Sequence, residues 1–290
     1  MRLERVAWLT ALRPITVAGP RPIFTALPHF SSLQIVNSVY GAPPTLSIKP
    51  GLPRTEICRD VLAFAAVHVF YDRDWSAAEA ESKRAMELSP GESVTHAHFA
   101  DYLSIRGRHS EAIAAYSRVL DLDPISRVYI GLFGLILYRA RRYDESIAQC
   151  QKALEIDPHY ANGLWFLALS LEQKGDLPGA IAKLEEAVSL SQGPHYRALL
   201  GRAYALAGEK SKALGILDEL KALSQQRYVS PCDIAVVQVG LDDQTSAFQS
   251  FEEAYQQHVF RIIELTMPMY DSLRSDSRWQ NLVRRIGLPQ

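Results

Sequence analysis

The 290-residue sequence has few cysteines and no long apolar run. Its three cysteines, Cys58, Cys150 and Cys232, lie far apart, and none has a cysteine or histidine partner at the spacing of a zinc site. This pattern predicts reduced thiols in a cytoplasmic protein. No apolar stretch approaches the roughly 18 residues that a membrane-spanning helix needs. We therefore expect no metal, no cofactor and no membrane insertion.

An excess of one charge is also absent. The chain has 31 Lys and Arg residues against 32 Asp and Glu residues, which gives a net charge of −1. Residues 1–54 contain six basic side chains and one acidic side chain, so the remainder of the chain is mildly acidic. Binding to phosphates needs clustered Lys and Arg. The acidic remainder therefore argues against nucleic acid as a partner of this chain.

A period of 34 residues runs through most of the chain. Pro90, Pro124 and Pro158 lie 34 residues apart, and each ends a similar run, such as ALEIDP. Columns of small residues share this period, with the same slip of one residue: Ala66, Ala100, Gly134, Ala168, Gly201 and Ala235, and also Ala78, Ala112, Ser146, Ala180, Ala213 and Ala247. Such a unit cannot bury its apolar face alone, so we expect a stacked array of helix pairs.

The recurring residue types fit two helices in each unit. Small side chains let the two helix axes approach closely. Gly107, Gly175 and Gly208 follow the expected first helices, where a C′ glycine ends a helix. The prolines follow the second helices, because the residue before a proline is pushed out of the α conformation.

This pattern resembles the tetratricopeptide-repeat (TPR) family, which has a 34-residue helix-turn-helix unit. The resemblance implies an all-α, right-handed solenoid over residues 55–290 with about six repeats, starting near Arg59, Ser93, Arg127, Ala161, Pro194 and Tyr228. Residues 1–54 hold half of the 16 prolines and show no helix or strand period. We expect them to form an irregular arm.

A capping helix is expected over about 275–287. Its apolar residues form one stripe at i, i+3, i+4 and i+7, namely Trp279, Leu282, Val283 and Ile286. Ser275 or Asp276 can cap its N-terminus, and Gly287 with Pro289 ends it. A terminal helix of this kind shields the core of the last repeat.

The resemblance further implies that the concave groove is the functional surface. We predict that it binds a peptide or protein partner through Phe70, Tyr71, Asp101, Tyr138, Arg139, Trp165, Glu172, His195 and Arg202. Tyr138, Arg139, Trp165 and Arg202 are expected at its centre, because aromatic and arginine side chains dominate binding hot spots. For each residue, the alternative is packing between adjacent repeats. The groove positions hold no lysine, which argues against a C-terminal carboxylate as ligand.

The C-terminal part carries a second resemblance. The runs RYVSP (227–231) and LRSDSRW (273–279) resemble the C-terminal TPR region of bacterial multidomain regulators, which carry winged-helix, serine/threonine kinase or adenylyl-cyclase-type domains. This implies an interaction scaffold in bacterial signalling or regulation. The alternative is a C-terminal fragment of a larger transcription regulator or kinase with no independent activity. No nucleophile motif is present, so we expect no enzyme. The oligomeric state is left open.

Overall fold

The computed structural model describes residues 14–15, 23–24, 65, 69, 73–191 and 193–289. Apart from one short antiparallel pairing, of β1 (Pro14–Ile15) with β2 (Ile23–Phe24), this described part is built of helices and turns. It contains twelve α-helices and two 3-10 helices, so the predicted all-α class is confirmed. The boundary expected near residue 54 lies outside the described residues and stays a prediction.

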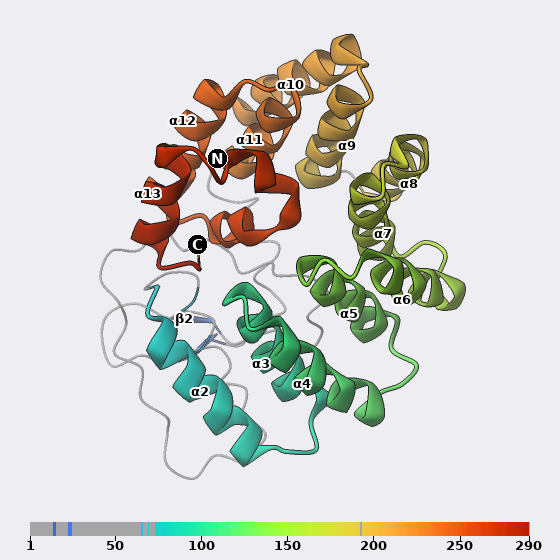
Figure 1. The fold of residues 1–290 in the computed structure, drawn as a ribbon, viewed down its shortest axis with the longest axis vertical. Helices are drawn as coiled ribbons and strands as arrows, with labels where there is room; N and C mark the ends of the chain where they lie inside the picture. The colour runs from blue at the N-terminus through green and yellow to red at the C-terminus, as the bar shows by residue number, and fades with distance from the viewer. Residues whose placement is uncertain are drawn as a thin grey trace.

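The helices follow the predicted pairs. The first helices of units two to six are α3 (Ser93–Ile105), α5 (Arg127–Arg139), α7 (Ala161–Gln173), α9 (Pro194–Leu206) and α11 (Pro231–Gly240). The second helices are α2 (Trp75–Leu88), α4 (His109–Leu122), α6 (Tyr143–Ile156), α8 (Leu177–Leu190), α10 (Lys210–Ser224) and α12 (Gln244–Gln256). Each first helix packs on its own second helix, and α3 packs on α5, α5 on α7 and α9 on α11. Together they follow an incomplete ring (Figure 1).

Close packing explains the columns of small residues. Ala100, Ala112, Ala180 and Ala213 are completely buried at the helix contacts. A Cβ atom added at Gly134 would lie only 2.5 Å from the Cys150 Sγ atom, so the position has no room for a side chain. The small residues therefore set the distance between paired helices.

Three of the turns after first helices use glycine, as predicted. Gly107, Gly175 and Gly208 have φ values of 74°, 83° and 83°. The same left-handed conformation is taken without glycine by Arg141 (φ 62°) and Asp242 (φ 61°) in units three and six. Glycine thus takes the left-handed position of this turn in three units, and the turn forms without glycine in two others.

The C-terminal part closes the ring. After α12 come η2 (Phe260–Thr266), η3 (Pro268–Leu273) and α13 (Ser277–Ile286). Asp276 caps α13 by accepting a hydrogen bond from the Arg278 N–H group at 2.7 Å, and Gly287 ends the helix with φ 78°. The expected stripe on α13 is buried.

The helix α13 covers more than the last repeat. It packs on α12, and its Ile286 carbonyl accepts a hydrogen bond from the Trp75 indole N–H group of α2 at 2.9 Å. The Arg106 side chain at the end of α3 donates to the Gly287 carbonyl. The capping helix therefore joins the two ends of the array.

Candidate functional site on the concave face

The concave side of the first helices is occupied by the chain's own C-terminal part. Residues 259–274, which we call the strap, connect α12 to α13 and contact both α3 and α7. Figure 1 shows this red segment on the inner side of the ring. Eight apolar strap side chains are at most 3% exposed: Val259, Ile262, Ile263, Leu265, Met267, Met269, Tyr270 and Leu273.

This burial indicates how firmly the strap is held. Each side chain of this kind contributes about 1.5–3 kcal/mol when it is fully buried. The entropy lost when the segment is ordered offsets part of this gain. The strap therefore packs as part of the core, and we expect chains with an open concave face to be a minor population.

Tyr138 and Trp165 lie at the centre of this contact. Tyr138 is completely buried, and its hydroxyl accepts a hydrogen bond from the Met269 N–H group of the strap at 3.1 Å. Trp165 is 5% exposed and packs edge-on against the His195 ring, at 4.3 Å between centroids. The Arg261 guanidinium of the strap lies 5.9 Å from the Trp165 ring centroid. The two aromatic residues thus contact the strap directly.

A buried charged cluster surrounds Arg261. Its guanidinium lies 2.7 Å from a Glu264 carboxylate oxygen and 3.6 Å from the Asp233 Oδ1 atom. The Arg261 Nη2 atom is 3.3 Å from His195 Nε2, while His195 Nδ1 is 3.3 Å from Asp233 Oδ1. Burial and the charge of Arg261 lower the pKa of His195 to about 4, against the opposing effect of Asp233. At neutral pH the His195 ring is therefore uncharged. Its Nδ1 atom donates to Asp233, and its Nε2 atom accepts from Arg261, which can only donate.

Two further ion pairs lie on this face. Arg139 Nη1 is 2.5 Å from Asp101 Oδ1, with the arginine side chain 2% exposed and the aspartate 27% exposed. Arg202 Nη2 is 2.9 Å from Glu172 Oε1, and these side chains are 7% and 6% exposed. Both pairs join neighbouring first helices, α3 to α5 and α7 to α9.

The structure thus brings seven of the nine predicted site residues together on the concave side. Phe70 and Tyr71 lie outside the described residues. The other seven are half-buried or buried among neighbouring helices and the strap. An open groove at their centre was expected, and in this conformation the strap covers it. Binding of a partner by these residues stays a prediction.

Sequence reasoning missed the residues that hold the strap. Arg141 forms a bidentate ion pair with the strap residue Asp271, at 2.6 and 2.8 Å. Asp233 and Arg261 were not predicted either. The signal for the strap was in the sequence: residues 259–273 are rich in large apolar side chains but lack a helical period.

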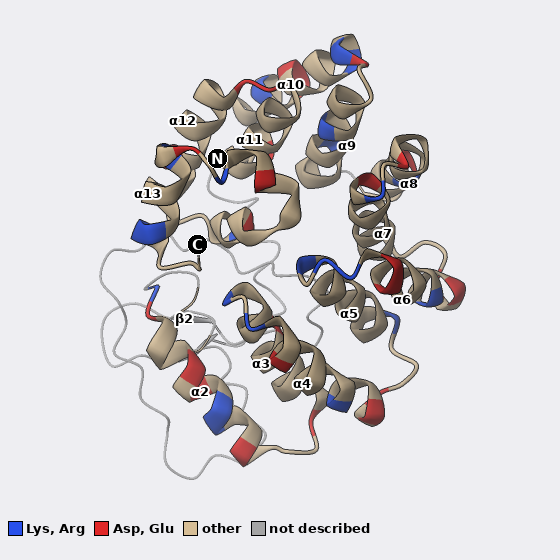
Figure 2. Ribbon diagram, viewed as in Figure 1, with Lys and Arg blue, Asp and Glu red and all other residues tan. Residues whose placement is uncertain are grey.

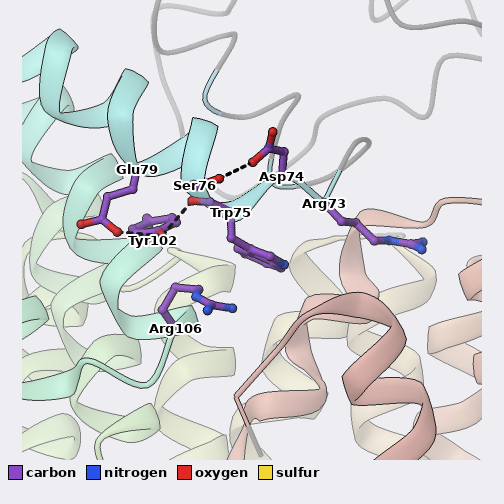
Figure 3. Close-up of a pocket in the computed structure, with 7 residues that line it drawn as sticks. All are labelled: Arg73, Asp74, Trp75, Ser76, Glu79, Tyr102 and Arg106. Carbon is purple, nitrogen blue, oxygen red and sulfur yellow. Dashed lines mark hydrogen bonds between the residues drawn. The ribbon is translucent and has the colours of Figure 1, made fainter.

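The junction between the two ends of the array forms an open pocket (Figure 3). Its lining comes from α2, from α3 and from the residues that precede and follow them: Arg73, Asp74, Trp75, Ser76, Glu79, Tyr102 and Arg106. The Tyr102 hydroxyl has two acceptors for its one hydrogen, the Trp75 carbonyl at 2.9 Å and a Glu79 carboxylate oxygen at 3.1 Å. Since these side chains contact one another and α13, the pocket belongs to the closure of the ring.

Other kinds of site find no support in the described ranges. No group of three or more His, Cys, Asp or Glu side chains there is placed to hold a metal ion. No helix among these residues is long and apolar enough to cross a membrane. Figure 2 shows Lys and Arg interspersed with Asp and Glu along the described helices.

Replacing Tyr138 by phenylalanine tests the contact with the strap. The change keeps the ring but leaves the buried Met269 N–H group without its acceptor, so we expect a loss of about 1–2 kcal/mol in the free energy of unfolding. Faster hydrogen exchange of the Met269 amide should accompany it. Tyr116→Phe is the matched control, because the buried Tyr116 hydroxyl has no hydrogen-bond partner among the described residues. Equal effects of the two changes would contradict the prediction.

The buried His195 predicts a pH dependence of stability. Its pKa in the folded chain, about 4, lies below its ordinary value of 6.5. The unfolded chain therefore takes up the proton first as the pH falls, and the free energy of unfolding decreases from about pH 6.5 down to pH 4. The full loss is about 3 kcal/mol, because one pKa unit corresponds to about 1.4 kcal/mol.

Urea titrations of wild type and His195→Gln between pH 7 and pH 4 measure this effect. The variant should show a shallower slope. Some slope will remain, because burial also lowers the pKa of His98 and of His109. The exposed His159→Gln is the control and should keep the wild-type slope. Identical slopes for wild type and His195→Gln would contradict the assignment.

Comparison with known proteins identifies the repeats. Residues 99–161, 132–195 and 167–227 match the family model described as tetratricopeptide repeat. The chain therefore contains TPR repeats, as its 34-residue period predicted, and the helix pairs pack as TPR repeats do. A search of curated proteins gives no significant match.

Solved structures share the fold. A structure of PilF from Pseudomonas aeruginosa is 15% identical, with 80% of this chain and 99% of that chain covered and a TM-score of 0.51. TTC0263, a thermophilic TPR protein in Thermus thermophilus, is 20% identical, with 65% and 99% covered and a TM-score of 0.54. PilW, a type IV pilus biogenesis factor, is 18% identical, with 79% and 99% covered and a TM-score of 0.53. At these identities the likeness shows the fold alone.

Proposed function

We propose that the protein is an interaction scaffold whose concave face binds a segment of a partner protein. One observation carries the proposal: side chains of α5, α7, α9 and α11 already hold an irregular chain segment there. Tyr138, Arg139, Trp165 and Arg202 form the centre of the proposed surface. A regulatory role in a bacterium is part of the proposal and rests on the resemblance of the C-terminal runs. The proposed cytoplasmic location rests on the cysteine pattern, and the proposed lack of catalysis rests on the lack of a nucleophile motif in the sequence. The alternative role, as the C-terminal fragment of a larger regulator, rests on the same resemblance.

A photo-crosslinking amino acid at two leucine positions tests this proposal. Leu206 is 40% exposed and lies one helical turn after Arg202 on α9, so it faces the concave side. Leu214 is 49% exposed on the second helix α10 and is the matched control. In cells of the source organism, we expect a discrete partner to be crosslinked from position 206 and not from position 214. Crosslinking from position 214 alone, or from neither, would overturn the proposal.

A further inference from the structure

We infer that the concave face recognises a segment with the chemistry of the strap itself, so that the strap and a partner segment compete for it. The inference rests on the proposed function and deepens it by naming the class of ligand. The ligand class is a short segment with an arginine and a glutamate three residues apart, large apolar side chains, and an aspartate after them. Residues 261–271 supply this pattern in the chain itself.

The arginine of the pattern enters a site built from three first helices. Arg261 meets the Trp165 ring of α7, the His195 ring of α9 and the Asp233 carboxylate of α11. Its side chain is 12% exposed and that of Asp233 is 6% exposed. Glu264, three residues on, lies 2.7 Å from the same guanidinium. An aromatic ring and a buried carboxylate together select a cation, and arginine suits a flat ring better than lysine does.

The later part of the segment is held through its backbone and through its aspartate. The Tyr138 hydroxyl of α5 accepts a hydrogen bond from the Met269 N–H group. Because the donor is a backbone group, this contact does not depend on which side chain the segment has at position 269. At the edge of the concave face, the Asp271 carboxylate accepts hydrogen bonds from both terminal nitrogens of Arg141, at 2.6 and 2.8 Å. Such paired hydrogen bonds fix the direction of the bound segment as well as its charge.

The apolar side chains limit which partners can compete. They fill the space between these polar contacts, with Ile262, Leu265 and Tyr270 at most 2% exposed. A segment that offered fewer contacts would leave the concave face exposed to water. A partner competes best when it offers contacts of the same kinds as those of the strap, so we expect its chemistry to match.

The strap stays attached to the chain when it is replaced. It is followed by α13, which is fastened to α2 by the Trp75 hydrogen bond and to α12 by two bonds from Arg285 to Glu252, at 2.7 and 2.8 Å. A tethered competitor has a high effective concentration. The apparent affinity for a partner is then lowered by the fraction of chains in which the concave face is open.

A labelled synthetic peptide with the sequence of residues 258–275 is the probe, and fluorescence anisotropy is the measurement. The peptide is added to the full wild-type chain and to the full chain with the strap substitutions Arg261→Ala and Asp271→Ala. These substitutions weaken the strap and leave the groove residues intact. We expect the variant to bind the peptide at least about tenfold more tightly than the wild type, since more of its concave faces are open.

A control peptide with the same two alanines should bind the variant at least about tenfold more weakly, because it lacks both charged contacts. Asp271→Ala alone is a second variant, and we expect it to keep the fold because 36% of the Asp271 side chain is exposed. It should shift the affinity in the same direction by a smaller factor.

The inference is overturned if the folded variants bind neither peptide, or bind both peptides equally. Thermal melting of each variant establishes that it is folded. Failure here is distinguishable from failure of the proposed function. A partner crosslinked from position 206 without any peptide binding would remove this inference alone, whereas peptide binding without a crosslinked partner would remove the proposed function.

Discussion

Replacing Trp165 by alanine is expected to destabilise the fold by about 3–5 kcal/mol, the usual cost of removing a large aromatic side chain from a core. The Trp165 side chain is 5% exposed, and its ring lies 4.7 Å from that of Phe166 and 4.3 Å from that of His195. The strap covers it through Arg261. The substitution would therefore leave a cavity bordered by α7, α9 and the strap. Movement of one of these elements alone would not fill it.

Equilibrium unfolding in urea measures this loss. Leu214→Ala serves as the control, because that leucine is 49% exposed and surface changes of this kind stay within about 0.5 kcal/mol. Limited proteolysis adds a local measurement: in Trp165→Ala the strap should be cut faster than in the wild type. A loss below about 1 kcal/mol would mean that the Trp165 side chain contributes little to the core.

The fold could be predicted from the sequence because the information is local and repeated. The same small residue returns every 34 positions, and each return marks the same contact between two helices, as Gly134 and Cys150 illustrate. Four first helices begin at the expected residues Ser93, Arg127, Ala161 and Pro194. The turns at Arg141 and Asp242 were not predictable in this way, since their left-handed conformation lacks the glycine signal.

The candidate site could be predicted only in part, for a different physical reason. Helical period places a side chain on one face of its helix, and the resemblance to TPR repeats implied that Tyr138, Trp165 and Arg202 lie on the concave side. Neither signal shows which surface is covered by a segment that is distant in the sequence. The strap has no period of its own: Pro268 separates two 3-10 helices, and its contacts span more than 100 residues, as between Met269 and Tyr138. Burial of the concave face therefore depends on tertiary contacts, which the local sequence pattern does not encode.

Arg202 illustrates the consequence for stability. The sequence analysis expects Arg202 at the centre of a binding groove, where the loss of its side chain would cost little stability. The structure corrects this expectation, because Arg202 is 7% exposed and bonds Glu172 at 2.9 Å, with Glu172 itself 6% exposed. Alanine would leave the Glu172 carboxylate buried without its partner. We expect Arg202→Ala to cost about 3–5 kcal/mol, which is typical when one member of a buried ion pair is removed.

A double substitution separates the loss of the pair from the loss of packing. In Arg202→Met/Glu172→Met both charges are gone and apolar volume is kept, so most of the lost stability should return. Lys212→Ala is the control, since its pair with Glu209 is exposed and is worth at most about 1 kcal/mol. Urea unfolding of the single and double variants gives the comparison. If Arg202→Ala costs no more than Lys212→Ala, the carboxylate of Glu172 reaches water without its partner, and the concave face between α7 and α9 is open in solution.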